Sequence, residues 1–494
     1  MSTAPLETRP STVPSEVADR LRSIVGERNC IVESSQLRTY ESDGLTSFHA
    51  MPGIVVLPAS TEEVVQIVRI VREAGLPIVP RGAGTGLSGG ALPVPGCVLV
   101  GMSRMRSILE IDLENGWMRV QPGVINLDVS KRIGAEGYYY APDPSSQSVC
   151  TIGGNVSENS GGAHCLKYGF TVNHVLGARI VLSDGEVVDL GGPVKDAPGY
   201  DLLGVLVGSE GTLGIVTEVV LRILRKPQAT RTFLATFPST AEAGNAVSAI
   251  IAGGIVPAAI EMMDRLAIVA AKAATGVDWP DVGAVLLMDV DGPLAEVEHT
   301  SAAAIEMTSC AGALEIRRPK DEDERALLWK GRRSAFAAVG RISPNYVVQD
   351  GVIPRSKIAE VLGDIETLSR ESGLRIANVF HAGDGNLHPL VLYDAKVPGQ
   401  EKLAEDVAGE ILRVCLRFGG SITGEHGVGA DKTAFMAEMF TESDLETMNR
   451  IRCAFDPQNR FNPGKVFPTP RLCGDRPGIY RPHSAELSGQ ADRV

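Results

Sequence analysis

Two histidines, His381 and His388, flank a predicted hairpin in the second half of the chain. The run ANVFHAGDGNLHPLVLY places Asp384-Gly385 between two apolar arms, and such a pair is a strong signal for a two-residue turn. If these residues form the turn, His381 lies directly opposite His388, with Cβ atoms roughly 5 Å apart on one sheet face. The spacing predicts two imidazoles that converge on a metal ion. Two ordinary strand histidines are the alternative.

A second polar pair, Glu425-His426, stands between Gly424 and Gly427. Adjacent side chains in so glycine-rich a segment can diverge into one cavity. We expect Glu425 to be the third metal ligand, because two histidines and one carboxylate leave open positions for a substrate. His426 would then act as a base near neutral pH. Taken alone, the same pair is also compatible with a polar turn.

The segment VPRGAGTGLSGGA, residues 79–91, follows a short apolar strand and carries five glycines. Such a cluster indicates turns with positive φ or close approach of bare backbone to a ligand. Gly84, Gly86 and Gly89 fit a dinucleotide fingerprint, but that fingerprint must open a helix, and ALPVPG follows here. No Lys-Ser or Lys-Thr follows, so a P-loop is excluded. An amide nest for a pyrophosphate or a merely tight connection remains.

Two further glycine-rich segments decide between these readings. They are YAPDPSSQSVCTIGGNVSENSGG at 140–162 and GSEGTLG at 208–214. Together the three loops resemble the flavin-binding domain of the vanillyl-alcohol oxidase and p-cresol methylhydroxylase (PCMH) superfamily. HAGDGNLHP (381–389), GGSITGEHGVG (419–429) and FDPQNRFNPGK (455–465) resemble the C-terminal half of FAD-linked 2-hydroxyacid dehydrogenases. The resemblance covers about residues 20–470.

The resemblance implies an α+β fold. A PCMH-type FAD-binding domain of two subdomains would be followed by an α+β substrate (cap) domain. The expected division is an N-terminal segment at 1–50, the FAD-binding domain at 51–227, the cap domain at 228–440, a segment returning to the FAD-binding domain at 441–470, and a tail at 471–494.

The same resemblance implies FAD as the cofactor, with the backbone of 81–87 at its pyrophosphate. Some superfamily members attach the flavin through a histidine near this loop, but no histidine stands between residues 50 and 163, so we expect non-covalent FAD. The expected FAD-binding residues are Arg81, Gly82, Ala83, Gly84, Thr85, Gly86, Leu87, Pro142, Asp143, Ser146, Gly154, Asn155, Asn159, Gly161, Ile215 and Asn462.

A 2-hydroxy acid also needs a partner for its carboxylate, and a bidentate arginine is the usual one. Trp329-Lys330-Gly331-Arg332 matches the family segment that carries this arginine, so Arg332 is the first candidate and Arg333 the second, against a solvated helix face. In relatives that use dicarboxylates a lysine lies near what is here Val347-Val348-Gln349. Its absence favours a small monocarboxylate.

The expected reaction is oxidation of a small D-2-hydroxy acid to a 2-oxo acid. Arg332 would hold the carboxylate, the metal would polarise the 2-hydroxyl, and His426 would take its proton while hydride passes to flavin N5. The metal needs only Lewis acidity, so Zn2+ is expected before Mn2+ or Fe2+. The resemblance implies glycolate as substrate and glyoxylate as product, with D-lactate or another D-2-hydroxy acid as the alternative. A flavin-bearing assembly subunit without activity is the second alternative.

Composition limits the partners. A net charge of −13 argues against nucleic acid or an anionic membrane. The eight cysteines show no CxxC spacing, so no iron–sulfur cluster or haem attachment is encoded. Electrons must therefore leave through a diffusing acceptor or a partner, and the resemblance implies an iron–sulfur subunit and a second flavin-domain-like subunit. With no signal pattern at the amino terminus, we expect a cytoplasmic protein, peripheral at the inner membrane only through that complex.

The elements that must position these residues can be read from local patterns. Residues 54–57 and 76–79 are apolar strands. The helix between them has a Ser60/Glu63 capping box, a Val64, Val68 and Val71 stripe, and a stop at Gly75. ARIVLSDGEVVDL at 178–190 predicts a hairpin around Asp184-Gly185. Further on we expect a buried helix and turn within 243–260, a strand at 284–290 and a helix at 357–372.

Overall fold

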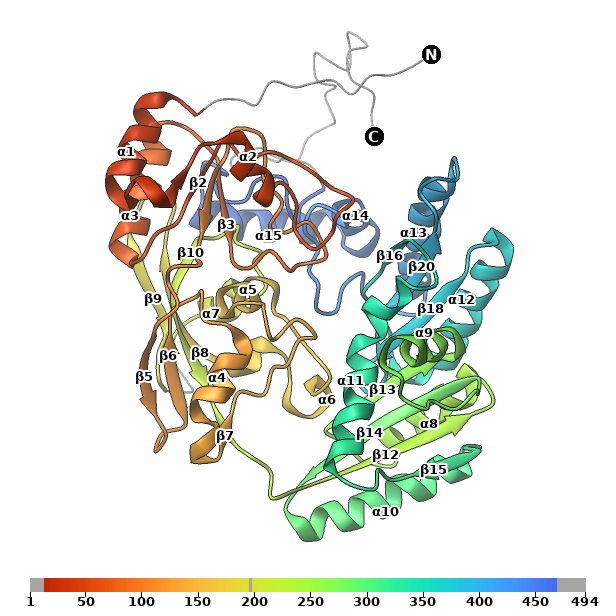
Figure 1. Cartoon of the computed structure of the whole chain (residues 1–494). Helices are drawn as coiled ribbons and strands as arrows, with labels where there is room; N and C mark the ends of the chain where they lie inside the picture. Colours follow the sequence, from red (N-terminus) through yellow and green to blue (C-terminus); the bar gives the residue numbers. More distant parts are fainter. Residues whose placement is uncertain (1–12, 195–197, 469–494) are drawn as a thin grey trace.

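The computed structural model describes residues 13–194 and 198–468, which form two domains side by side (Figure 1). The expected tail at 471–494 lies outside the described residues. The first domain carries a four-stranded sheet in the order β1-β2-β4-β3. Its strands are β1 (Cys30–Ile31), β2 (Ile54–Val56), β4 (Val98–Gly101) and β3 (Ile78–Arg81). Both β2 and β3 run parallel to β4.

The helix α3 (Thr61–Glu73) connects β2 to β3 as the sequence predicts, and it packs on α1 (Ser15–Val25). Val64, Val68 and Val71 are fully buried, and the chain turns at Gly75 with φ +69°. Ser60 caps the helix by accepting from the Glu63 N–H, but the Glu63 carboxylate accepts from the N–H of Ala59 instead of Ser60. The strand–helix–strand unit thus delivers the chain into the glycine loop after Arg81.

A second, antiparallel sheet completes the first domain, in the order β5-β6-β10-β8-β9. The predicted hairpin is confirmed, since β8 and β9 pair from Val181 opposite Val187 around a turn with Gly185 at φ +81°. The strands are β5 (Ile108–Asp112), β6 (Trp117–Val120), β10 (Ile215–Arg222), β8 (Val175–Val181) and β9 (Val187–Gly191). The short helices α4 (Asn126–Ile133) and α5 (Ile152–Glu158) pack into the same core through Val129, Ile152 and Val156.

The second domain is built on a larger antiparallel sheet in the order β15-β12-β14-β13-β18-β19-β17, with β20 joining β18 to β16. The predicted strand at 284–290 lies within β14. The bounds are β12 (Ala229–Phe237), β13 (Ala259–Asp264), β14 (Ala284–Gly292), β15 (Glu315–Arg317), β16 (Asn345–Val348), β17 (Gly351–Val352), β18 (Ile376–His381), β19 (Asn386–Leu387) and β20 (Pro389–Tyr393).

Helices cover both faces of this sheet because its strands are apolar on both sides. Along β12, Phe233, Ala235 and Phe237 join one hydrophobic core, while Leu234 joins the other. The first core includes α8 (Thr240–Ala252), α10 (Leu294–Cys310), α12 (Ile358–Ser372) and α13 (Gln400–Arg417); the second includes α9 (Arg265–Thr275) and α11 (Glu322–Val339). The predicted helix at 357–372 is confirmed as α12, and the run at 243–260 forms most of α8, a Gly253-Gly254 turn and the start of β13.

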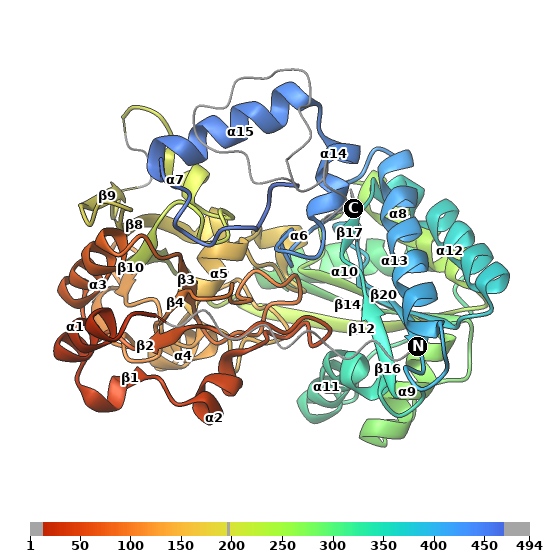
Figure 2. The same cartoon turned by 90° about the horizontal axis from the view of Figure 1, so that it is seen from above.

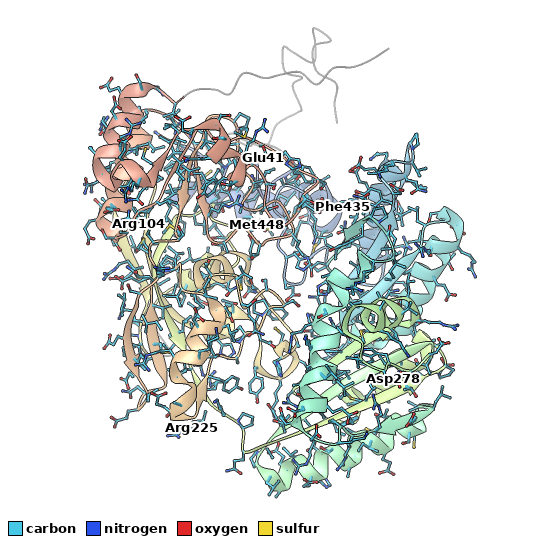
Figure 3. The ribbon with its side chains drawn as sticks, in the orientation of Figure 1. Glu41, Arg104, Arg225, Asp278, Phe435 and Met448 are labelled. Carbon is cyan, nitrogen blue, oxygen red and sulfur yellow. The ribbon has the colours of Figure 1, made fainter. Side chains whose placement is uncertain are left out.

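The chain crosses between the domains twice. It leaves the first domain at Arg225, whose guanidinium lies over the Tyr138 ring at 4.8 Å, at the foot of that domain in Figure 3. After α13 it returns through α14 (Met436–Met439) and α15 (Glu442–Phe455), which lie along one side of both domains in Figure 2. Phe461 then forms a parallel bridge with Ile78, next to the glycine loop. Among the described residues, no helix is long and apolar enough to cross a membrane.

Candidate active site

A cavity of about 410 Å³ lies where the three glycine-rich loops of the first domain face the second domain. Backbone forms much of its wall. A Cβ on Gly82 would clash with the Thr151 hydroxyl, and one on Gly84 (φ +69°) would clash with the Arg81 guanidinium. The expected cofactor residues that line it are Arg81, Gly82, Ala83, Gly84, Thr85, Gly86, Leu87, Ser146, Gly154, Asn155, Ile215 and Asn462.

Four expected cofactor residues lie beside this wall instead of in it. Pro142 accepts a hydrogen bond from Asn126, and Asn159 accepts one from the N–H of Val172. Gly161 packs against Phe170, where a Cβ would lie 2.7 Å from the ring. The Asp143 carboxylate lies 2.8 Å from His164 Nδ1. These contacts show local structural roles, and they leave the loops at 81–87 and 150–155 as the main polypeptide wall.

His164 and its partner Asp143 join the two domains. The His164 ring stacks on Trp329 of α11, with ring centroids 6.0 Å apart. Burial opposes protonation of His164, but Asp143 outweighs it and raises the pKa to about 9. Nearby, Lys167 pairs with Asp291 of β14 at 2.6 Å. The cavity therefore lies between domains that are joined by charged contacts.

The histidine hairpin of the second domain has a different register from the one predicted. His381 pairs with Asn386 instead of His388, and β18 meets β20 in the same register, with Asn378 opposite Pro389. A four-residue connection replaces the two-residue turn. Because the shift is by two residues, both imidazoles keep the same sheet face as diagonal neighbours. Their ring centroids are 5.2 Å apart, so the predicted convergence is present although its register was wrong.

Glu425 completes this group. Its Oε1 lies 3.4 Å from His381 Nε2 and 3.3 Å from His388 Nε2, and one ligand atom from each residue falls within 4.8 Å of the others. His381 and His388 are buried. Two imidazole nitrogens and a carboxylate oxygen pointing to one place form a donor set typical of divalent metal sites.

Charge balance in this group depends on a second carboxylate that the sequence did not reveal. Buried Glu261 of β13 lies 2.7 Å from His381 Nδ1, which leaves the Nε2 of that ring facing Glu425. Burial would lower the pKa of His381, but Glu261 and then Glu425 outweigh it and raise the pKa well above its usual range. Burial would likewise raise the pKa of Glu425, but hydrogen bonds from the two imidazoles lower it. Glu425 is therefore held as a carboxylate.

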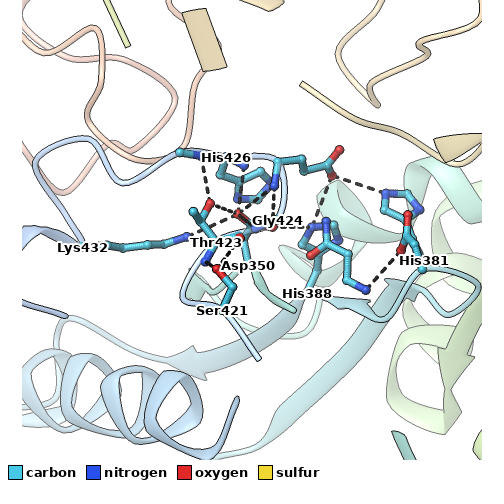
Figure 4. A network of polar contacts seen from close by, with 12 residues as sticks. Asp350, His381, His388, Ser421, Thr423, Gly424, His426 and Lys432 are labelled. Atoms are coloured by element: carbon cyan, nitrogen blue, oxygen red, sulfur yellow. Dashed lines mark hydrogen bonds and ion pairs between the residues drawn. The ribbon is translucent and has the colours of Figure 1, made fainter. Parts of the chain in front are cut away.

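Asp350 holds the loop that presents Glu425 and His426. This buried carboxylate follows β16 and accepts hydrogen bonds from the Thr423 hydroxyl (2.6 Å) and from the N–H groups of Gly424 (3.0 Å), Glu425 (3.2 Å) and His426 (2.9 Å). Lys432 Nζ lies 3.4 Å from it (Figure 4). Burial opposes its ionisation, but His426 and Lys432 keep the pKa well below its usual range.

His426 lies in the cavity wall and stacks on His388 with ring planes 7° apart and centroids separated by 5.0 Å. Burial lowers the pKa of His426 to about 4. The ring is therefore neutral at neutral pH and free to accept a proton, but it is a weaker base than the imidazole of near-neutral pKa that the sequence predicted. Asp350, His388 and His426 form a second possible metal site, because they also offer three ligand atoms within 4.8 Å of one another. However, Asp350 Oδ2 already accepts hydrogen bonds from the loop at 423–426. The set of His381, His388 and Glu425 is therefore the better candidate.

Arg332 does not reach the cavity wall. Its guanidinium pairs with Glu261 at 2.5 Å, and the side chain is buried behind His381. Its Nε has no hydrogen-bond partner among the described residues. Phe336, one turn further along α11, does line the cavity, while Arg333 is exposed. The structure thus groups Arg332 with the histidines through Glu261, and it does not bring Arg333 to the site.

The cavity wall continues from the glycine loops to His388, Glu425 and His426. Sequence reasoning missed several members of this site: Glu158, Glu210, Glu261, Phe336, Tyr346, Asp350 and Lys432. Glu158 and Glu210 stand inside the glycine-rich blocks, yet a buried acid is not expected near a pyrophosphate. Glu261 lies in the apolar strand β13 and Asp350 in the connection between β16 and β17, and neither belongs to a local motif, so only the tertiary contacts reveal them.

The first domain contributes the glycine-rich loops of the cavity, and the second contributes His381, His388 and Glu425, here called the ligand cluster. This combination is typical of a flavin-dependent oxidoreductase. A model of the FAD binding domain matches residues 52–191, and a model of FAD linked oxidases, C-terminal domain, matches residues 226–466. The glycolate oxidase subunit GlcD of Escherichia coli (strain K12) is 45% identical over 475 residues, 96% of this chain and 95% of that protein. The chain therefore belongs to the family of FAD-linked oxidases that includes GlcD.

Two other similarities bear on fold and family. A D-lactate dehydrogenase of Anaerostipes hadrus is 33% identical over 427 residues, 84% of this chain and 90% of that protein. The structure of p-cresol methylhydroxylase with substrate bound has a TM-score of 0.78 at 18% identity, covering 92% of this chain and 98% of that one. The predicted α+β fold, with a PCMH-type FAD-binding domain and a C-terminal domain, is confirmed, as is FAD as the cofactor.

Replacing Asp350 by Ala should destabilise the second domain strongly. The change leaves Lys432 and the loop donors at 423–426 buried without their acceptor, a loss of about 3–5 kcal/mol. We expect a clear drop in the thermal or urea midpoint. Asp364→Ala, which removes a half-exposed carboxylate, is the control and should stay within about 0.5 kcal/mol. Equal midpoints for the two variants would contradict the anchoring role of Asp350.

Proposed function

We propose that this protein oxidises a small D-2-hydroxy acid, glycolate first, to the 2-oxo acid, and that it serves as the flavin subunit of a glycolate oxidase. The observation that carries the proposal is the continuity of one cavity wall from the FAD-binding loops to His388, Glu425 and His426. The similarity to GlcD over nearly the whole chain supports the choice of glycolate. An inert assembly subunit would have no need of the ligand cluster.

Bound FAD supplies the acceptor for the hydrogen that leaves C2 of the substrate. His426 is the proposed base for the hydroxyl proton, because it is neutral and lies in the cavity wall. Glu425, on the same loop, keeps its negative charge between His381 and His388. The loop thus presents a proton acceptor and an anionic ligand side by side.

A divalent metal, Zn2+ in the first instance, would be held by His381, His388 and Glu425 and would supply Lewis acidity at the substrate hydroxyl. The residues fit such an ion. The Nε2 atom of His388 lies 3.3 Å from Glu425 Oε1, and the His388 ring lies next to that of His381, with centroids 5.2 Å apart. Glu261 fixes His381 from behind, as outer-shell carboxylates do in metal sites.

Arg332 remains the proposed partner of the substrate carboxylate. It lies behind the cavity wall in the structure, where it pairs with Glu261, the partner of His381, and it shares a face of α11 with the cavity residue Phe336. Glu261 already neutralises part of its charge, which favours a substrate with one carboxylate over a dicarboxylate. Tyr346, next to Val347 on β16, adds an aromatic side chain to the wall.

GlcD is named as a subunit of glycolate oxidase, which supports a complex, and in such a complex the flavin could pass its electrons to partner chains. We propose an iron–sulfur subunit and a second flavin-domain-like subunit as those partners, with any contact to the inner membrane made through them. Purification of the complex from its native source, followed by iron analysis, tests this part. A protein that is isolated alone and reduces a soluble acceptor at full rate would contradict it.

The experiment that tests the proposed activity is anaerobic mixing of the FAD-loaded protein with a panel of acids. Bleaching of the flavin absorbance should be fast with glycolate and slower with D-lactate, and absent with L-lactate. D-lactate is the second candidate because a D-lactate dehydrogenase is among the relatives. Faster bleaching by D-lactate would replace glycolate with that substrate. No bleaching by any acid would favour the inert assembly subunit.

His426→Ala should retain FAD and slow single-turnover flavin reduction on the order of 100-fold, because a positioned base is lost. The control is His299→Ala, since His299 lies exposed on α10. The measurement is the stopped-flow bleaching rate at saturating substrate. An unchanged rate in His426→Ala would assign the base elsewhere.

Removal of the metal should separate cofactor binding from activity. His388→Ala, or prolonged chelation of the parent protein, should lower the divalent metal content while FAD stays bound and substrate bleaching fails. Elemental analysis and the flavin spectrum give the two readings. Full bleaching by a metal-free preparation would show that His381, His388 and Glu425 work without an ion.

FAD should be released by denaturation, because no histidine stands between residues 50 and 163, the part of the sequence around the 81–87 loop. We expect a colourless protein band and free flavin in the supernatant after heating in detergent. Flavin fluorescence that stays with the protein band would demonstrate a covalent bond.

A further inference from the structure

Glu158 ends α5 with its carboxyl group in the wall of the cofactor cavity. Its Oε2 is buried and has no hydrogen-bond partner among the described residues. A buried carboxyl oxygen without a partner is costly unless a ligand satisfies it. The cavity is where that ligand would be, because the side chain lines it.

Neighbouring contacts place this carboxyl at the catalytic end of the cavity. A Cβ on Gly427 would clash with Glu158 Oε2, and Gly427 directly follows Glu425 and His426. On its other side Glu158 packs against Gly90, where a Cβ would lie 2.6 Å from Oε1. If the acid is oxidised beside Glu425 and His426, as proposed above, the flavin ring must occupy this end of the cavity.

A second carboxyl, Glu210, lies next to Glu158 but is satisfied. Its two oxygens accept hydrogen bonds from the N–H groups of Val428 (2.7 Å) and Gly429 (2.6 Å). A Cβ on Gly427 would lie 2.9 Å from Glu210 Oε1, so both carboxyls border the same glycine. Two adjacent buried carboxylates do not both ionise readily, and the one that accepts backbone N–H groups keeps the charge.

The remaining charges agree with this division. Burial raises the pKa of Glu158, with Glu210 and Asp43 adding to the shift, and Lys432 opposes it. Lys432 is itself directed at Asp350, 3.4 Å away. Burial also raises the pKa of Glu210, but its two backbone donors and Lys432 limit that rise, whereas the pKa of Glu158 is raised well above its usual range.

We propose that Glu158 is protonated in the resting protein and donates a hydrogen bond to the flavin ring of bound FAD. The proposal depends on the proposed function only for which end of FAD lies at Gly427. The hydrogen bond from a neutral donor to the flavin ring becomes stronger when the ring gains electrons. Glu158 would therefore stabilise the reduced flavin relative to the oxidised flavin. Because no proton leaves Glu158, the redox step itself is unchanged.

The test compares Glu158→Gln, which keeps a neutral donor, with Glu158→Met, which has similar size and no donor. The midpoint potential of bound FAD is measured by equilibration with redox dyes, and the dissociation constant of FAD by titration of the apoprotein. Glu114→Gln, in an exposed turn, controls for loss of a carboxylate elsewhere.

We expect Glu158→Gln and Glu114→Gln to keep the parental potential and FAD affinity. Glu158→Met should bind FAD about five-fold more weakly. It should also shift the oxidised-to-reduced equilibrium about ten-fold toward the oxidised form, about 30 mV for a two-electron couple. A rise in potential in Glu158→Gln would show that Glu158 is anionic, and an unchanged potential in both Glu158 variants would show that it does not meet the ring. Dye equilibration uses no substrate, so failure of the proposed activity would not affect this result.

Discussion

The site depends on one loop that two buried carboxylates hold from opposite sides. Asp350 of the second domain accepts hydrogen bonds from residues 423–426, and Glu210 of the first domain accepts those of Val428 and Gly429. Glu425 and His426 belong to this loop, and their side chains line the cavity together with His388. Backbone N–H groups that would otherwise be buried without partners are satisfied by the acids. The loop therefore fixes the active-site side chains and the seam between the domains with the same bonds.

The buried charged side chains of this region form a chain of contacts. Each one is neutralised or held in place by the next. Arg332 balances Glu261, Glu261 holds His381, and His381 with His388 holds Glu425. Asp350 is balanced by Lys432. Breaking one member of such a chain leaves an uncompensated buried charge, which costs several kcal/mol, whereas an intact chain adds little to stability. The network is therefore better explained by orientation of the ligand cluster than by stabilisation of the fold.

Local sequence patterns correctly predicted those helices, strands and turns that are determined by neighbouring residues in the chain. The α3 helix, the hairpin at Asp184-Gly185 and the strand at β14 follow from periodicity, capping and turn chemistry. The hairpin of His381 and His388 shows the limit. Its turn chemistry favoured Asp384-Gly385, but the pairing of β18 with β20 and β13 sets the register two residues away. Convergence survived because a shift of two preserves the sheet face.

Residues that act through tertiary contacts could not be predicted in this way. Asp350, in the connection between β16 and β17, and Glu261, in β13, are far in sequence from the loop and the histidine that they hold. The proximity of the Glu158 and Glu210 carboxyl groups is seen only in the folded protein, where both lie next to Gly427. The motifs predicted the FAD cofactor and the candidate metal ligands, whereas these acids, which orient the candidate ligands and set their charge, could be found only from the tertiary structure.

The central claim is that the FAD-binding loops and the ligand cluster serve one reaction in one cavity. It is tested most directly by reducing the bound flavin anaerobically with glycolate and with glycolate deuterated at C2, in single turnovers at saturating substrate. If the C2–H bond breaks in the step that reduces the flavin, bleaching should be slower with the deuterated acid, and the final spectrum should be the same. Equal rates for the two acids, or formation of glyoxylate while the flavin stays oxidised, would contradict it.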